Sequence, residues 1–236
     1  MAILPKIPAT VKKVQDLCHD TKSFILGTEQ PLKYQAGQFV MLNIPYKDTH
    51  VRRAYSIANR PENKHIELCL NFVPSGKASH FLFNIKPNET VMIDGPYGIF
   101  KLKHNTNDKL FVCTGTGVAP LRAMIQELLS SKENKSNTRI TLIFGERTEA
   151  ELLYKKEFEQ LQKAHKNFKY IPTLSKPHKG WNGEKDYVQY VIQKYINQPQ
   201  TTDVYICGMK EMVEHVQTTL LEFNIPKQNI FIEKFV

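Results

Sequence analysis

The chain has 236 residues, of which 41% are hydrophobic and 10% aromatic, so it carries enough apolar surface for packed cores and does not have a disordered composition. No window approaches the roughly eighteen apolar residues of a membrane span, and the first residues lack a secretory signal, so we expect a cytoplasmic protein with no integral membrane segment. The formal charge is +9, and residues 1–103 hold 14 Lys and Arg against 8 Asp and Glu, which suits an acidic partner and a solvated lysine-rich surface equally well.

The first part of the chain consists of short β-favouring runs broken by Gly, Pro and Asn. Strands of this length and spacing are typical of a β-barrel or a β-sandwich. One helix is expected at residues 77–85. The expected strands are 11–14, 23–28, 38–44, 54–58, 65–73 and 90–95.

After about residue 104 apolar β runs alternate with longer helical periods, which predicts a parallel sheet covered by helices on both faces. The polar stretch 102–109 separates the two patterns, so we expect domains at 1–103 and 104–236. The expected strands are 110–115, 140–146, 168–174, 204–208 and 230–236, and the expected helices are 119–131, 149–164, 186–196 and 210–223.

The turn CTGTGVAP, at 113–120, lies where the first of these strands gives way to a helix. Glycines here let the backbone approach a pyrophosphate, whose charge the helix N-terminus stabilises. Proline stands where the usual fingerprint has its third glycine, and it suits the first helical turn. The turn predicts a dinucleotide site made of Thr114, Gly115, Thr116, Gly117 and Pro120.

Glu146 and Arg147 follow the second strand of this part, where nucleotide-binding α/β domains read the adenosine ribose. An acid favours an unphosphorylated ribose and an arginine a phosphorylated one, so the pair does not decide between NADH and NADPH. Both residues could also be solvated, and Thr148 with Glu151 has the spacing of a capping box.

Cys207 ends the fourth strand, and ligands of open α/β sheets bind at such carboxyl ends, although an isolated strand cysteine is more often buried packing. The other cysteines lie at 18, 69 and 113, tens of residues apart. No CxxC pair exists to hold zinc or an iron–sulfur cluster, so no metal site is expected.

Six motifs occur in a fixed order along nearly the whole chain: RAYS at 53–56, GKAS at 76–79, GPYG at 95–98, GTGVAP at 115–120, ICG at 206–208 and EKF at 233–235. Together they resemble the ferredoxin-NADP reductase superfamily, and more closely its oxygenase-reductase and flavin-reductase branches. The resemblance implies a flavin-binding antiparallel β-barrel followed by a Rossmann-like domain that binds the nicotinamide nucleotide. The segment 180–188 departs from the family pattern, because Asp186 stands where glycine often precedes the tyrosine.

The resemblance implies a role for each matching residue of the first domain. Arg53 corresponds to an arginine that pairs with the flavin pyrophosphate, Tyr55 to an aromatic that packs on the isoalloxazine, and Ser56 to a serine near its hydride-accepting nitrogen, with Ala54 between them. Alternation along the strand would turn Arg52 away from that site. The second pyrophosphate site, which favours FAD over FMN, corresponds to Gly76, Lys77, Ala78 and Ser79.

In the second domain the resemblance places Cys207 beside the nicotinamide and lets the chain turn at Gly208. Glu233 and Phe235 correspond to a carboxylate and an aromatic near the flavin. The implied catalytic residues are therefore Ser56, Cys207 and Glu233. The implied cofactors are FAD and NADH or NADPH, with NADH favoured by Glu146 and Glu151 near the expected ribose.

The expected function is an NAD(P)H-dependent flavoprotein reductase that passes electrons to a separate acceptor, such as an acidic ferredoxin, a flavodoxin or an oxygenase component. One alternative is an NAD(P)H:flavin oxidoreductase that uses free flavin as its substrate, and another is a non-catalytic electron-transfer subunit of a larger complex. No helix-turn-helix, RNA-binding or zinc signature supports a nucleic-acid module, so no nucleic-acid partner is expected.

Overall fold

The computed structural model describes residues 4–61, 64–130 and 138–235. Ser131 and Val236, the last residues of two expected elements, lie outside these ranges. The chain forms two compact units: the first extends to Leu102 and includes Arg122–Glu127, and the second begins at Lys103 and holds the rest. Within the described residues no helix is both long and apolar enough to cross a membrane.

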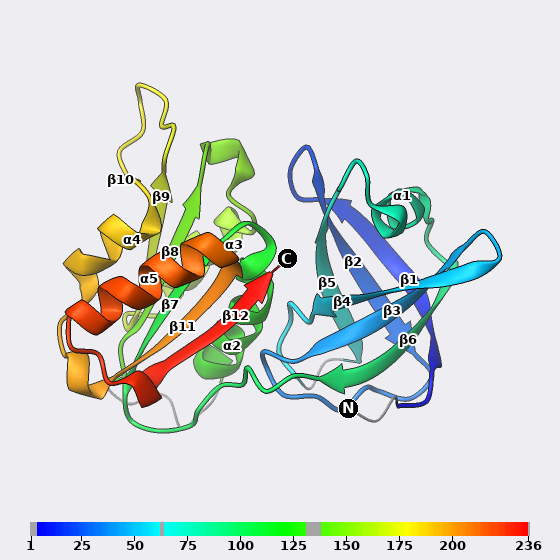
Figure 1. Ribbon diagram of the computed structural model, residues 1–236, viewed down its shortest axis with the longest axis horizontal. Coiled ribbons are helices and arrows are strands. Elements are labelled where there is room, and N and C mark those ends of the chain that lie inside the picture. The colour runs from blue at the N-terminus through cyan, green and yellow to red at the C-terminus, as the bar shows by residue number, and fades with distance from the viewer. Residues whose placement is uncertain (1–3, 62–63, 131–137, 236) are drawn as a thin grey trace. The chain divides into compact units, whose positions relative to one another are not determined.

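The first unit contains a six-stranded antiparallel sheet in the order β4-β3-β6-β1-β2-β5 (Figure 1). An isolated bridge between Ile57 and Leu68 joins the residue after β4 to the opposite edge strand, so the sheet closes into a barrel, as expected. The strands are β1 (Ile7–Asp16), β2 (Thr21–Thr28), β3 (Phe39–Tyr46), β4 (Thr49–Ser56), β5 (His65–Asn71) and β6 (Thr90–Tyr97).

Alternating apolar side chains fill the inside of this barrel, as the two-residue period of strands requires. Phe24, Leu42, Leu68 and Ile93 are each at most 2% exposed. The helix α1 (Lys77–Asn84) adds Leu82 to the same core and contacts both β3 and β4. The barrel therefore holds β4, which carries the RAYS motif, beside the helix that begins with the GKAS motif.

The second unit contains a six-stranded parallel sheet in the order β10-β9-β8-β7-β11-β12, which confirms the expected α/β architecture. The strands are β7 (Asp108–Thr114), β8 (Ile140–Glu146), β9 (Phe168–Leu174), β10 (Glu184–Lys185), β11 (Thr202–Met209) and β12 (Ile230–Phe235), and the helices are α2 (Val118–Ser130), α3 (Lys155–Ala164), α4 (Val188–Val191) and α5 (Lys210–Glu222).

Helices cover both faces of this sheet. On one face Val191 of α4 and Val216 of α5 pack with Val112 and Ile206 of the central strands, and Figure 1 shows α5 crossing in front of the sheet. On the other face the ring of Phe158 of α3 lies tilted against the ring of Tyr170, with 5.3 Å between the ring centroids. Ile171, the next residue of β9, packs on the first face. The turns that follow β7, β8 and β11 lie at the carboxyl ends of these strands.

The single helix expected over 149–164 is wrong. A short 3₁₀ helix, Glu149–Glu151, comes first, and α3 begins only at Lys155. Tyr154 between them has a φ of 55°, a left-handed conformation that no α-helix can pass through. The capping box is confirmed, because Thr148 N donates to Glu151 Oε2 at 2.8 Å, but it begins the short helix rather than a long one.

The polar stretch between the two sequence patterns is hydrogen-bonded into the second unit. Lys109 is fully buried, and its Nζ lies 3.2 Å from Asp203 Oδ2 and 2.5 Å from Asn105 Oδ1. The amides of Asn105 and Asn107 each donate to Asp203 at 2.9 Å, and Lys103 N donates to the Tyr205 hydroxyl at 2.8 Å. These contacts satisfy a buried ion pair that would otherwise be costly.

Candidate functional site

Arg53 of β4 is exposed and pairs with Leu42 of β3. Its Nη1 donates to the backbone oxygen of Arg52 at 3.0 Å, and within the described part of the chain no carboxylate pairs with it. A guanidinium in this state keeps most of its donors for a ligand, and its fork matches two phosphate oxygens.

Arg52 faces the other side of the strand and binds Asp94 of β6, which is completely buried. Arg52 Nε donates to Asp94 Oδ2 at 3.2 Å and its Nη2 pairs with Oδ1, while Asn43 Nδ2 and the Tyr97 hydroxyl each donate to Asp94 at 2.7 Å. Burial raises the pKa of Asp94, but the hydrogen bonds from Arg52, Asn43 and Tyr97 outweigh burial and lower it to about 2. Asp94 is therefore a structural carboxylate, which sequence patterns did not reveal.

Tyr55 shares a side of β4 with Arg53, because they are two positions apart along the strand. Its ring is partly buried against the barrel core. Burial raises the pKa of Tyr55 to about 12, so the phenol stays neutral. Ala54 between them is exposed, and Ser56 at the strand end is buried. The strand thus presents a cation and an aromatic face on one side.

The start of α1 provides the second set of candidate groups in the barrel unit. Gly76 is the N-cap and makes no side-chain cap, and no acidic residue lies in the first turn. Ser79 Oγ lies 2.7 Å from Val73 O and 2.8 Å from Gly76 O, so its hydroxyl proton already has an acceptor, while Ala78 beside it is buried. Lys77 Nζ lies 4.5 Å from the centroid of the Tyr46 ring. Backbone N–H groups of the first turn remain the main anion-binding groups here.

The turn after β7 has the geometry expected of a phosphate-binding loop. Gly115 has a φ of 55°, and a Cβ built there would meet nothing within 4 Å. A Cβ on Gly117 would lie 2.3 Å from Cys207 O, so only glycine lets the turn approach β11 this closely. Thr116 lies between these glycines, and Pro120 occupies the first turn of α2.

Thr114 Oγ1 is buried and has no hydrogen-bond partner among the described residues. It lies beside Gly208, because a Cβ built on Gly208 would come within 2.7 Å of it. An unpaired buried hydroxyl is unfavourable, and a ligand that supplies its partner removes that cost. The position of Thr114, between an open glycine turn and the end of β11, therefore marks where such a ligand would bind.

Glu146 ends β8 next to the same turn, and its Oε1 accepts a hydrogen bond from Gly115 N at 2.9 Å. Arg147, which follows, is exposed. Glu149 pairs with Lys155 and with His178, whose Nε2 lies 2.7 Å from Glu149 Oε2. These two hydrogen bonds, Lys155 first, lower the pKa of Glu149. The structure therefore ties Glu146 to the turn and leaves the Arg147 guanidinium facing solvent.

Cys207 is completely buried in β11, between Cys113 of β7 and Glu233 of β12. Its Sγ lies 3.9 Å from Glu233 Oε2. Burial, reinforced by the Glu233 charge, raises the pKa of Cys207 well above its usual value, so the thiol keeps its proton. Phe235, two residues beyond Glu233, is partly buried and opposite Met209.

The candidate residues thus form one set in each unit. In the first unit the barrel places Arg53 and Tyr55 on the strand that contacts α1. In the second unit Thr114, Gly117, Cys207 and Gly208 meet at the carboxyl ends of β7 and β11. Glu146 joins this second set through Gly115, which the ribose rule did not anticipate.

Residues 8–102 match the family described as an oxidoreductase FAD-binding domain, and residues 111–218 match the oxidoreductase NAD-binding domain. A ferredoxin–NADP reductase B from Sorangium cellulosum is 31% identical over 222 residues, which cover 90% of either chain. The chain belongs to the ferredoxin-NADP reductase superfamily. The expected family, and with it the FAD-binding and NAD-binding domains, is confirmed.

Two further proteins of the comparisons are similar to this chain over nearly its whole length. The reductase component of a phenol 2-monooxygenase from a Pseudomonas species is 32% identical over 231 residues, which cover 95% of this chain but only 64% of that protein. The crystal structure of an Amycolatopsis cytochrome P450 reductase matches with a TM-score of 0.89 and 27% identity, covering 98% of this chain and 70% of that one. The chain therefore spans just under two thirds of its phenol 2-monooxygenase relative.

The residues present fit both cofactors of the ferredoxin-NADP reductase superfamily. For FAD, the exposed Arg53, which no described carboxylate pairs with, would supply a phosphate ligand on a strand that contacts α1. For the dinucleotide, the unpaired Thr114 hydroxyl and the open space at Gly115 supply a hydrogen bond and room for the pyrophosphate. No described residue fills either position with a competing anion, apart from Glu146 at Gly115 N.

Proposed function

We propose that this protein takes hydride from NADH or NADPH onto a bound FAD and passes the electrons to a separate acceptor. FAD supplies the conversion of a two-electron donor into a one-electron source. The observation that carries the proposal is the turn at the ends of β7 and β11, where the unpaired Thr114 Oγ1 lies beside Gly208 and the open Gly115. Membership of the ferredoxin-NADP reductase superfamily supports the same function.

Each set of residues has a task in this function. Arg53 and the backbone N–H groups at Gly76–Ser79 would bind the flavin pyrophosphate, and Tyr55 would cover a face of the flavin ring. Gly115 and Gly117 would admit the nicotinamide nucleotide, and Pro120 lies in the first turn of the helix that follows. Cys207, neutral and buried, would pack near the nicotinamide with Glu233 beside it. Ser56 would hydrogen-bond near the hydride-accepting nitrogen of the flavin. These residues align the reactants rather than react themselves.

The purified chain is expected to be yellow, to retain FAD and to lose its colour without oxygen when NADH or NADPH is added. Stopped-flow absorbance with each nucleotide measures the rate. NADH is expected to react faster, because Glu146 and Glu151 place negative charge near the expected ribose. A faster reaction with NADPH would instead mean that the exposed Arg147 binds the 2′-phosphate. A colourless protein that neither retains nor reduces added flavin would contradict the proposal.

Replacing Arg53 with alanine is expected to weaken FAD binding roughly 10- to 100-fold, because it removes charge-assisted hydrogen bonds to phosphate. The melting temperature of the flavin-free protein is expected to stay unchanged, because among the described residues the Arg53 side chain hydrogen-bonds only to the backbone oxygen of Arg52. Fluorescence titration of the flavin-free protein with FAD measures the affinity. Lys13→Ala removes the same charge from an exposed position of β1 and is the matched control. Equal FAD affinities of the two variants would mean that Arg53 does not bind the flavin.

The alternative in which free flavin is the substrate is favoured by one observation. Ser79 is expected to bind the flavin phosphates, but its hydroxyl proton is already donated to the backbone oxygen of Val73 or Gly76. One hydrogen-bond donor fewer is therefore available to bind FAD. Gel filtration separates the two functions: a prosthetic FAD stays with the protein, and a substrate flavin is lost and must be added back.

In this proposal the basic charge of residues 1–103 is compatible with an acidic electron acceptor. The excess of Lys and Arg in residues 1–103 complements an acidic ferredoxin, a flavodoxin or an oxygenase component. Reductase relatives of oxygenase systems support an acceptor of this kind.

The cytoplasmic location stays a prediction of the sequence, which cell fractionation tests.

A further inference from the structure

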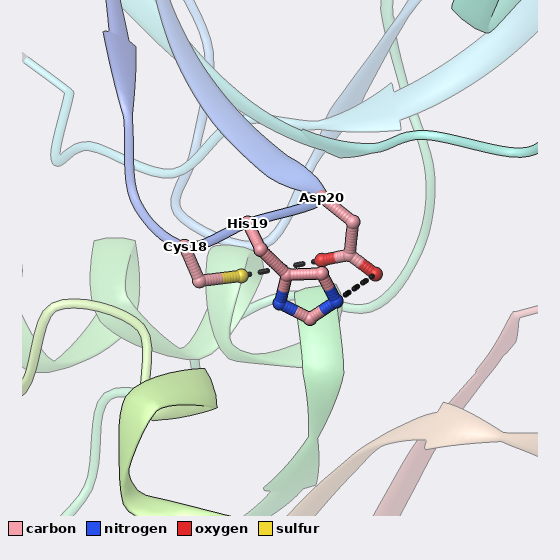
Figure 2. A group of neighbouring side chains, drawn as sticks. All are labelled: Cys18, His19 and Asp20. Atoms are coloured by element: carbon pink, nitrogen blue, oxygen red, sulfur yellow. Dashed lines mark hydrogen bonds and ion pairs between the residues drawn. The ribbon is translucent and has the colours of Figure 1, made fainter.

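The turn between β1 and β2 brings a thiol, an imidazole and a carboxylate together. Cys18, His19 and Asp20 are consecutive, and Figure 2 shows their side chains projecting from the same side of the turn. Cys18 Sγ lies 3.2 Å from Asp20 Oδ1, and His19 Nε2 lies 3.6 Å from Asp20 Oδ2. One potential ligand atom from each residue lies within 4.8 Å of the others. Such a cluster lies outside both cofactor sets described above.

These separations are close to those of a tetrahedral metal site. Zinc bonds of about 2.0–2.3 Å place neighbouring ligand atoms about 3.3–3.8 Å apart. The separations of 3.2 Å to Asp20 Oδ1 and 3.6 Å to Asp20 Oδ2 lie at or near that range. They end on the two oxygens of one carboxylate, so side-chain rotations would bring the three ligand atoms onto one ion. His19 and Asp20 are 70% and 46% exposed, which leaves the fourth position open to water.

The backbone and a neighbouring hydroxyl hold these ligands in place. Thr21 O accepts hydrogen bonds from Leu17 N at 2.8 Å and Cys18 N at 3.2 Å, and Asp20 O accepts one from Phe72 N at 2.6 Å. Thr21 Oγ1 donates to Asp20 Oδ1 at 2.9 Å, as the hydroxyl of an outer shell does when it orients a ligating carboxylate. The nearest lysine in the chain, Lys22, pairs instead with Asp16 at 3.6 Å.

We propose that the β1–β2 turn binds Zn²⁺ through Cys18 Sγ, His19 Nε2 and Asp20. Thiolate and imidazole ligands favour zinc over magnesium or calcium, and the two negative ligands neutralise the ion. The spacing of cysteines along the sequence predicted no metal site, because that rule looks for paired thiols and cannot detect one thiol joined by an imidazole and a carboxylate.

Zinc protection of Cys18 from alkylation tests the proposal directly. Cys18 is partly exposed, whereas the other three cysteines are buried, so iodoacetamide labelling read by mass spectrometry reports on this thiol. In the full-length purified protein, micromolar Zn²⁺ is expected to slow labelling of Cys18 at least tenfold. Calorimetric titration with zinc chloride is expected to give one equivalent bound.

Four variants decide whether the three residues act together. His19→Gln and Asp20→Asn are expected to abolish most of the protection, and Cys18→Ser to abolish the calorimetric binding. His215→Gln removes an exposed imidazole from α5 and is expected to change neither measurement. Absent protection, or protection that survives both His19→Gln and Asp20→Asn, would overturn the proposal, because a lone thiol would then explain the result. Both of these variants keep Cys18, so they remain informative if Cys18→Ser fails to fold.

Discussion

Replacing Gly117 with alanine is expected to slow the reduction of bound flavin by NAD(P)H on the order of 100-fold, while the flavin stays bound. The added Cβ would lie 2.3 Å from Cys207 O and 2.9 Å from Gly208 N. Both are backbone atoms of β11, which is hydrogen-bonded between β7 and β12, so a shift of this strand would cost much free energy. The turn must move instead, and it takes the nucleotide-binding groups with it. Anaerobic stopped-flow reduction measures the effect.

Gly180→Ala is the matched control for this change, because a Cβ there would meet only the His178 ring at an ordinary 3.5 Å. The FAD content of the Gly117→Ala protein, read from its visible absorbance, is expected to equal that of the control. An unchanged reduction rate in Gly117→Ala would mean that the 114–117 turn does not position the nucleotide.

Replacing Asp94 with alanine is expected to lower the free energy of unfolding by about 2–4 kcal/mol, as the loss of the acceptor of several buried hydrogen bonds does. The change leaves the buried amide of Asn43 and the Tyr97 hydroxyl without their acceptor, and Arg52 without its counter-charge. Urea unfolding of the flavin-free protein measures the loss.

Asp48→Ala removes an exposed carboxylate from the same unit and is expected to leave the stability unchanged. Arg52→Ala is expected to lower the melting temperature, as Asp94→Ala does, without weakening FAD binding. Arg52→Ala and Arg53→Ala should therefore separate stability from flavin affinity at neighbouring positions. Loss of flavin affinity in Arg52→Ala, with stability unchanged, would reverse the assignment of the two residues.

The two-residue period of a β-strand sets how much the sequence alone predicts about Arg52 and Arg53. Alternation predicts that Arg52 and Arg53 point to opposite sides of β4, and they do. It says nothing of Asp94, which is 42 positions away and reaches Arg52 only because β3 lies between β4 and β6. Buried partners of this kind depend on strand order, which a single sequence does not specify.

The helix expected over 149–164 shows a second limit. The apolar period in that stretch continues without a proline or glycine, so nothing local predicts the break. Tyr154 adopts its left-handed conformation within the folded unit, at a cost that tertiary packing must offset. In the candidate site, the glycine turn and the strand-end cysteine could be predicted from position, whereas the hydrogen bond from Gly115 to Glu146 could not.

The hydrogen bonds around Asp203 bear on how the second unit can be produced alone. A chain that began at Asp108, the first residue of β7, would lack the amides of Asn105 and Asn107 and the backbone donor of Lys103. Asp203 and Lys109 would then be buried together with four of their hydrogen bonds missing, two at each residue, and such a fragment would be prone to aggregate. A fragment intended for nucleotide-binding assays or spectroscopy should therefore start no later than Lys103.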